Sequence, residues 1–330
     1  MINFIIQRAL WSIFVVFMVL TAVFFLTFGI GQPAAVQLGP NATPAKIEEF
    51  EARYGLDRPI AEQFAAYLGA RPCLRVGSRN YDGGRGYCGL LQGDLGESLT
   101  HQDDVAAVIA LRLPRTLLLS GLALLFELVI GVFAGALAAV CRNTWIDTGI
   151  IGSALLGISL PTFVTGPLFL LILCANLGWF PVGGYGNTAL EHLHHAILPA
   201  FALAVVGAAT YTRIMRSEMV ETLNADYVRT ARAKGIGELQ IIVSHAMRNA
   251  LLPIVTLLGL QTAFLVTGAI ITEHIFAWPG MGSLAIEAIA SLDIYMVTAV
   301  VLITSITVQA GNLIADIAVA RLDPRIRLRR

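Results

Sequence analysis

The sequence predicts an all-α integral membrane protein with six transmembrane helices and both termini in the cytoplasm. Hydrophobic residues make up 56% of the 330 residues and charged residues only 13%, about half the share of a soluble domain, and the mean hydropathy is +0.74. Six apolar stretches are long enough to cross a hydrocarbon core, which takes about 20 residues of helix. They are Ala9–Ile30, Thr116–Val140, Ile150–Cys174, Ala196–Thr212, Leu251–Thr272 and Ile294–Ala315.

The first stretch, Ala9–Ile30, is expected to stay in the protein as a membrane helix. Its apolar run is longer than the 7–15 residues of a signal-peptide core, and no small-residue cleavage site is evident at its end. Helices are expected in all six stretches because lipid cannot satisfy an open backbone. The stretches also lack the alternation of barrel strands.

Basic residues are distributed asymmetrically, and this sets the orientation. With the N-terminus in the cytoplasm, the short outside loops 175–195 and 273–293 contain no Lys or Arg, in agreement with the positive-inside rule. Segment 31–115 does carry basic residues, but segments longer than about 60 residues cross the membrane largely regardless of charge. The basic residues placed inside are Arg8, Arg142, Arg213, Arg216, Arg229, Arg232, Lys234, Arg248, Arg321, Arg325, Arg327, Arg329 and Arg330.

Between the first two membrane helices the composition shifts to Pro, Gly and acidic residues, which predicts a small extracytoplasmic cap domain. Short helices are expected there over Thr43–Leu56, over Ala61–Leu68 and over Asp103–Leu113, the last along the membrane surface until Pro114 turns the chain inward. The predicted division is a first transmembrane helix at 1–30, the cap at 31–115, a five-helix core at 116–320 with a polar cytoplasmic loop at 213–250, and a basic cytoplasmic tail at 321–330.

Two of the four cysteines lie in the cap. Cys73 and Cys88 flank a Gly-rich stretch that can bend back on itself. A disulfide between them suits an oxidising compartment, and the alternative is a pair of free thiols. Cys141 and Cys174 lie at helix ends and are interpreted as packing residues.

The polar cytoplasmic loop is the most informative part of the chain. A short helix is expected over Tyr227–Lys234, capped by Asn224 or Asp226 and ended by Gly235 and Gly237. This helix is either a rigid handle that another protein grips or a basic loop that contacts lipid headgroups. A second helix should follow and lead into the fifth membrane helix, with an apolar face formed by Leu239, Ile242, Val243, Ala246 and Ala250.

Two segments of this loop, Asp226–Gly235 (DYVRTARAKG) and His245–Pro253 (HAMRNALLP), carry a family resemblance. They resemble the cytoplasmic signature loop, or EAA loop, of ABC importer permeases, in the form of the oligopeptide, dipeptide and nickel branch. Arg229-Thr230-Ala231 stands where the general motif has Glu-Ala-Ala, as in that branch. The resemblance spans nearly the whole chain and is typical of the first, B-type member of a permease pair. Further similar segments are Arg112–Leu117, Glu273–Gly282 and Leu322–Arg327.

The resemblance implies a transport subunit, not an enzyme, that forms half of a translocation path for peptides. It also implies a homologous second permease subunit, two ATPase domains or subunits that bind ATP and Mg, and an extracytoplasmic solute-binding protein, at a bacterial inner (cytoplasmic) membrane. No cofactor and no nucleic acid are expected on this chain, which has no phosphate-binding G-x-x-x-x-G-K-[ST] loop. Dipeptides, oligopeptides, nickel chelates and glycosides all stay open as substrates.

The resemblance also assigns two groups of site residues. The first group couples the chain to the ATPase, and the second forms an outer gate. The coupling residues are Asp226, Tyr227, Arg229, Thr230, Ala231, Arg232, Ala233, Lys234 and Gly235, and the gate residues are Glu273, Phe276, Trp278, Pro279, Gly280 and Met281.

Several residues in or near the membrane have two interpretations. Pro161 and Pro167 either serve helix packing or kink the third stretch around the path. Glu127 and Asp316 are either functional or bonded between helices, and Trp278 is either part of the gate or an interfacial anchor. Three histidines are either metal ligands or part of a solvated outside loop: His192, His194 and His195.

Two other function classes remain alternatives. An ion-coupled secondary transporter would need an inverted repeat and paired ionisable groups near the midplane, and the sequence shows no convincing repeat. An intramembrane protease would need a motif such as H-E-x-x-H, which the sequence lacks. Co-purification of an ATPase would separate the importer from both.

Overall fold

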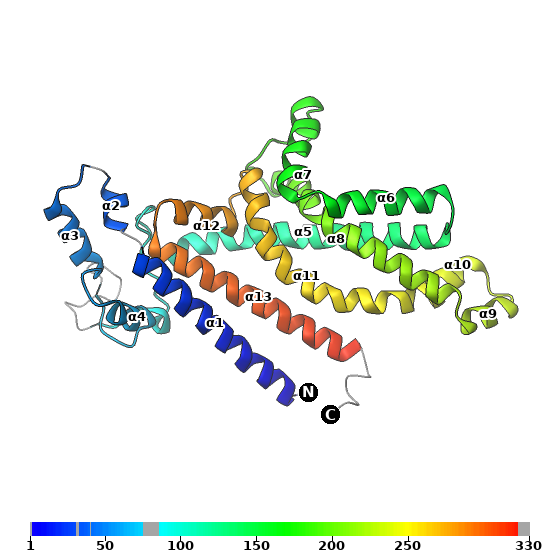
Figure 1. Cartoon of the computed structure of the whole chain (residues 1–330), viewed down its shortest axis with the longest axis horizontal. Coiled ribbons are helices and arrows are strands. Elements are labelled where there is room, and N and C mark those ends of the chain that lie inside the picture. Colours follow the sequence, from blue (N-terminus) through cyan, green and yellow to red (C-terminus); the bar gives the residue numbers. More distant parts are fainter. Residues whose placement is uncertain (1, 31–32, 40, 75–85, 323–330) are drawn as a thin grey trace. The chain divides into compact units, whose positions relative to one another are not determined.

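The computed structural model describes residues 2–30, 33–39, 41–74 and 86–322. Within these ranges most residues are helical and none belongs to a β-strand, as Figure 1 shows. Almost all of the predicted basic tail, 321–330, lies outside the described residues. The chain divides into two compact units, which are Met1–Arg115 with Pro279–Thr307 and Thr116–Trp278 with Val308–Arg330.

The first unit contains the first membrane helix and the cap. Phe24, from the first helix, is buried in the hydrophobic core of this unit and contacts the rings of Phe28, Phe64 and Tyr67. The elements of this unit are α1 (Ile2–Ile30), α2 (Pro33–Leu38), α3 (Pro44–Tyr54), α4 (Ile60–Leu68), the 3₁₀ turn η1 (Leu90–Gln92), the beginning of α5 (Val105–Val140), α12 (Met281–Ala290) and the first half of α13 (Ile294–Leu322).

Two of the three short cap helices form where the sequence predicts them. Pro44 occupies the first turn of α3, and Gly55 ends that helix in the left-handed conformation with a φ of 69°. A Cβ atom at Gly55 would lie 2.5 Å from Cβ of Leu74, so this position needs glycine for both its backbone and its space. Helix α4 ends in the same way at Gly69.

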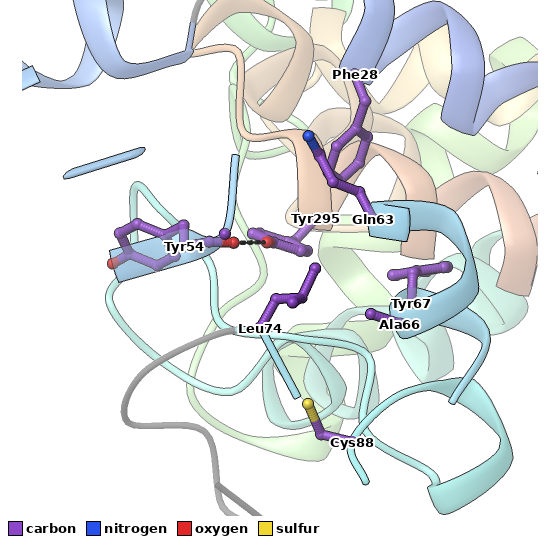
Figure 2. Close-up of a pocket in the computed structure, with 9 residues that line it drawn as sticks. Phe28, Tyr54, Gln63, Ala66, Tyr67, Leu74, Cys88 and Tyr295 are labelled. Atoms are coloured by element: carbon purple, nitrogen blue, oxygen red, sulfur yellow. Dashed lines mark hydrogen bonds between the residues drawn. The ribbon is translucent and has the colours of Figure 1, made fainter. Parts of the chain in front are cut away.

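A small, partly open cavity lies between the cap, α1 and α13, next to the disulfide that joins Cys73 and Cys88. Its volume of about 20 Å³ has room for about one water molecule, which is too little for a peptide side chain. Figure 2 shows the cavity and the bond from the Tyr295 hydroxyl to the carbonyl of Tyr54, 3.0 Å long. The lining residues are Phe28, Tyr54, Gly55, Gln63, Ala66, Tyr67, Leu74, Cys88 and Tyr295.

The expected break before the second membrane helix does not occur. Helix α5 runs without interruption over Val105–Val140 and contains Pro114. The separate surface helix predicted over Asp103–Leu113 is therefore wrong. Proline is tolerated inside an apolar helix when neighbouring groups satisfy the freed carbonyl. Pro114, nine residues after the beginning of α5, is such a proline.

The third apolar stretch is not one straight helix. It forms α6 (Trp145–Ser159) and then α7 (Thr162–Phe169) with the π-helical continuation η2 (Leu170–Asn176), and the two parts are bent by 107°. The bend lies at Leu160 and Pro161, because proline lacks the N–H that would continue the helix and disfavours α geometry in the residue before it. The structure thus shows a bend at Pro161, whereas Pro167 lies inside α7; that the bend surrounds the translocation path stays a prediction.

Helix α8 (Ala189–Leu223) organises the second unit. It packs against α6, α7 and α11 (Arg248–Ile275), and it extends about three turns beyond the predicted end at Thr212. The first part of the predicted loop 213–250 is therefore helix. Figure 1 shows α7 near one end of α8 and the short helices α9 (Asp226–Ala233) and α10 (Glu238–Gln240) at the other end.

Four described helices are long and apolar enough to cross a membrane, and the bent pair α6–α7 with η2 would make a fifth. The four are Ile5–Gly29, Val105–Val140, Ala189–Leu223 and Ile294–Ile314. The remaining predicted span, Leu251–Thr272, coincides with α11. Many side chains of α11 lie outside the described part of the chain, so the count of six stays a prediction.

Candidate functional site

The predicted coupling helix exists as α9, but other residues cap it. Ala225 is the N-cap, whereas Asn224 ends α8 and Asp226 is the first helical residue. The prediction of Asn224 or Asp226 as the cap is wrong because α8 is longer than expected and uses Asn224 for its own end. Asp226 still lies in the first turn, where a carboxylate stabilises the positive end of the helix dipole.

Helix α9 ends at a Schellman motif. Gly235 has a φ of 79° and donates its N–H to the carbonyl of Arg232 (2.9 Å), and the N–H of Ile236 reaches the carbonyl of Ala231 (3.3 Å). Glycine adopts this left-handed conformation without a Cβ clash. Gly237, the other predicted end, is instead the N-cap of α10.

Helix α9 is amphipathic, and its apolar face holds it against the next segment. Val228 and Ala231 are buried and pack on Ile241, which is also buried. Ala231 therefore faces inward, toward Ile241. The other eight predicted coupling residues are exposed: Asp226, Tyr227, Arg229, Thr230, Arg232, Ala233, Lys234 and Gly235.

Two of the exposed basic side chains have acidic partners. Nε and Nη2 of Arg232 donate to the two carboxylate oxygens of Glu238 at 2.7 and 3.2 Å. These hydrogen bonds hold the pKa of Glu238 below its usual range and raise the pKa of Arg232. Arg229 lies 3.6 Å from Asp226, and both of these side chains are highly exposed. The outward face of α9 thus keeps Arg229 and Lys234 accessible to a partner.

The second predicted helix is continuous with α11 but has a different inner face. Residues Ile241–Met247 form a π-helix, η3, between α10 and α11, and π stretches have an i→i+5 repeat. Ile241 and Ala246, five residues apart, are both buried, whereas Leu239 and Val243 are 76% and 51% exposed. The predicted apolar face fails at these two residues because it assumed a 3.6-residue repeat throughout.

The first half of the predicted gate lies at the end of α11, inside the second unit. Glu273 is fully buried, and the hydroxyl of Thr116 donates to its Oε1 at 2.5 Å. The carbonyl of Glu273 accepts the N–H of Trp278 at 2.8 Å, which closes the turn between them. Phe276 is also buried, and a Cβ atom at Gly183 would lie 2.6 Å from its carbonyl oxygen. This segment is therefore densely packed.

Trp278 has no exposed surface, so it does not lie where an interfacial anchor would. Its ring meets Tyr185 edge-on at 5.0 Å, and Tyr185 stacks on His192 at 3.8 Å. Nδ1 of His192 lies 2.8 Å from the carbonyl oxygen of Tyr185. The three histidines belong to the beginning of α8 and not to a solvated loop, because α8 begins at Ala189.

The second half of the predicted gate belongs to the first unit. The guanidinium of Arg115 lies 3.5 Å from the carbonyl oxygen of Pro279. Gly280 is the N-cap of α12, and Met281 is buried in the core of this unit. The two halves of the predicted gate therefore fall in different units. The gating role of these residues stays a prediction.

Sequence reasoning missed a close contact between α5 and α8. A Cβ atom at Gly131 would lie 2.4 Å from Cβ of Tyr211, and one at Gly135 would lie 2.6 Å from Cβ of Met215. Glu127, one turn earlier and 1% exposed, faces Gly207, where a methyl group would come within 2.1 Å of its carboxyl carbon. The signal was present, because Gly131 and Gly135 form a G-x-x-x-G motif.

Sequence reasoning also missed an ion pair between α6 and α8. Nε and Nη2 of Arg216 each donate to one carboxylate oxygen of Asp147 at 2.6 Å. The Asp147 side chain is only 6% exposed, and the N–H of Asn143 donates to it at 3.0 Å. No sequence spacing indicates this pair, because the two residues lie 69 positions apart.

In the described part of the chain, no group of three or more His, Cys, Asp or Glu side chains is arranged to hold a metal ion. Asp316 lies on α13 and is partly exposed. Neither observation identifies a catalytic centre.

Comparison with known proteins identifies the family. Residues 131–328 match the family model described as "Binding-protein-dependent transport system inner membrane component", and residues 1–120 match its N-terminal companion. The chain is 36% identical to the oligopeptide transport system permease protein AppB of Bacillus subtilis over 99% of both chains. It is 35% identical to the glutathione transport system permease protein GsiC of Escherichia coli (strain K12), also over 99% of both.

A solved structure supports the same fold. The MetNI methionine ABC transporter, in an inward-facing conformation, matches 66% of this chain and 97% of its own with a TM-score of 0.53 at 18% identity. That identity is low enough that the likeness concerns the fold alone. The family match, the two full-length relatives and the exposed signature helix α9 together show that this chain belongs to the binding-protein-dependent transport system inner membrane components, the permeases of ABC importers.

Proposed function

We propose that this chain is the B-type permease subunit of an ATP-driven peptide importer in a bacterial inner membrane. In this proposal it has six membrane spans and cytoplasmic termini, and it pairs with a homologous permease. Two ATPase domains or subunits bind ATP and Mg and dock on α9, and a solute-binding protein delivers the peptide outside. The names of the relatives, an oligopeptide permease and a glutathione permease, support peptides as the substrate class.

The observation that carries the proposal is the construction of α9. It is an eight-residue helix whose polar residues face outward and whose two apolar residues anchor it to η3. A basic loop that merely contacted lipid headgroups would not need a buried anchor. A rigid helix with an exposed polar face is what a partner protein can push or pull.

The same anchor links α9 to the predicted outer gate. Segment η3 continues directly into α11, which has 28 residues and therefore a length of about 40 Å. Glu273 and its turn with Trp278 lie at the far end of α11. A displacement of α9 by the ATPases would thus be passed through η3 to α11, which ends at the predicted gate. Nucleotide binding would then shift the equilibrium between two positions of α11.

Reconstitution tests the proposal. The purified chain is combined in proteoliposomes with its candidate partner permease, ATPase and binding-protein subunits, and uptake of a labelled peptide panel is measured. We expect uptake that requires ATP and Mg. Uptake driven by an ion gradient without ATP would overturn the proposal in favour of a secondary transporter.

A further inference from the structure

A side-chain hydrogen bond joins α9 directly to α11. Nδ2 of Asn249 donates to the phenolic oxygen of Tyr227 at 2.9 Å. Tyr227 is the second residue of α9 and Asn249 is the second residue of α11. The bond therefore spans 22 residues of sequence and bypasses the turn, α10 and η3 that connect the two helices along the backbone.

The Asn249 amide is held in a defined orientation. Its Nδ2 also donates to the carbonyl of His245, one turn earlier, at 3.0 Å. An asparagine that bonds its own helix backbone has fewer free rotamers, so little additional order is lost when it bonds Tyr227. The amide N–H is thus oriented to donate to the phenolic oxygen of Tyr227.

Among the described residues, the other links of α9 that we identify join it to segments before α11. The packing of Val228 and Ala231 on Ile241 is apolar and therefore non-directional. The ion pair of Arg232 and Glu238 joins the end of α9 to α10. The apolar contact with Ile241 alone would allow α9 to rotate about that contact. The hydrogen bond between Tyr227 and Asn249, near the N-terminus of α9, opposes this rotation.

We propose that Asn249 is a positioning residue that, through Tyr227, holds α9 at a fixed rotation relative to α11. A displacement of α9 then passes to α11 without being absorbed at the turn of Gly235 and Gly237. This inference rests on the proposed function, because it assigns Asn249 to the mechanical link between the ATPases and the membrane helices.

The test measures peptides transported per ATP hydrolysed in the reconstituted full complex. Asn249→Leu should keep ATPase activity but lower this ratio roughly two- to tenfold, the effect of losing one typical hydrogen bond. Tyr227→Phe, which removes a single oxygen atom, should lower it by the same factor. The double variant should be no worse than either single variant.

Two further variants sharpen the result. Asn224→Leu is the matched control, because Asn224 is also exposed and also bonds a carbonyl one turn earlier, that of Val220 at 2.7 Å, without reaching α9. It should keep the wild-type ratio. Asn249→Gln should restore much of the ratio, since its amide keeps an N–H that can donate to the phenolic oxygen.

Three outcomes would overturn the inference. They are an Asn249→Leu ratio equal to that of Asn224→Leu, losses that add in the double variant, and a normal ratio in Tyr227→Phe. If Asn249→Leu fails to assemble, Tyr227→Phe and Asn249→Gln decide the question. Failure of the proposed function is a separate result, because the wild-type complex would then show no ATP-dependent uptake at all.

Discussion

Substitution of Gly135 by alanine tests whether α5 and α8 approach as closely as the structure places them. The added methyl group would lie 2.6 Å from Cβ of Met215 and 2.6 Å from the carbonyl oxygen of Thr212. The second of these atoms belongs to the backbone and cannot rotate away. The two helices would have to separate by roughly 1 Å, which a close-packed interior resists.

The expected cost follows from two opposing terms. Overpacking of a well-filled contact costs about 1–3 kcal/mol, and the better helix propensity of alanine returns about 0.5–1 kcal/mol. The net loss is therefore about 0–2.5 kcal/mol, with a central value of about 1 kcal/mol. Gly121 is the matched control, because it lies on the same helix and, among the described residues, no atom outside its own helix turn lies within 4 Å of the place where its Cβ would be.

Thermal unfolding of the purified variants in one detergent provides the readout. Gly135→Ala should unfold several degrees below the wild type, since about 1 kcal/mol shifts Tm by a few degrees in a chain of this size. Gly121→Ala should match the wild type or exceed it. Equal melting temperatures for the two variants would show that the close α5–α8 contact is not present in the protein.

Three further predictions concern polar and covalent links. Arg216→Gln should destabilise the chain by about 1.5–3 kcal/mol, because it removes two charge-assisted hydrogen bonds from Asp147, while Arg216 itself is 29% exposed. Thermal unfolding of the single and double variants checks this, and Arg216→Gln combined with Asp147→Asn should lose less. Cys73→Ser should remove about 3 kcal/mol of stability from the cap and make the cap more sensitive to protease. Reduction of the wild-type protein should cause the same increase in protease sensitivity. A digest that is the same before and after reduction would refute the disulfide. Arg232 lowers the pKa of Glu238. The bond between them should therefore be intact at and above the usual carboxyl pKa and be lost only as the pH falls through the lowered pKa. NMR titration of the Glu238 carboxyl should show the low pKa, and the Glu238 pKa should return to its usual value in Arg232→Gln.

The sequence predicted most of the helices because long apolar runs and turn residues are local signals. Gly235 ends α9 where expected, whereas α3 ends at Tyr54, before the predicted Leu56, because Gly55 adopts the left-handed conformation. Errors arose where tertiary contacts override a local signal. Pro114 did not end α5, whereas Pro161 did end α6, and propensity alone gives the two prolines the same weight.

The candidate site was predicted in position but not in orientation. The residues of α9 are those expected, yet only the structure shows that Ala231 faces inward and that Arg232 and Tyr227 already have partners within the chain. The π-helical register of η3 carries no recognisable sequence signal. The pairing of Asp147 with Arg216 depends on the packing of α6 on α8, which no local pattern encodes.

Site-specific cross-linking from α9 tests the central claim most directly. A photoreactive residue at Arg229, on the exposed face of α9, is compared with one at Val182, which is 66% exposed on the predicted outside loop. Within the assembled importer, the residue at position 229 should capture an ATPase subunit and the residue at 182 should not. An intact complex in which position 229 captures no ATPase would contradict the account.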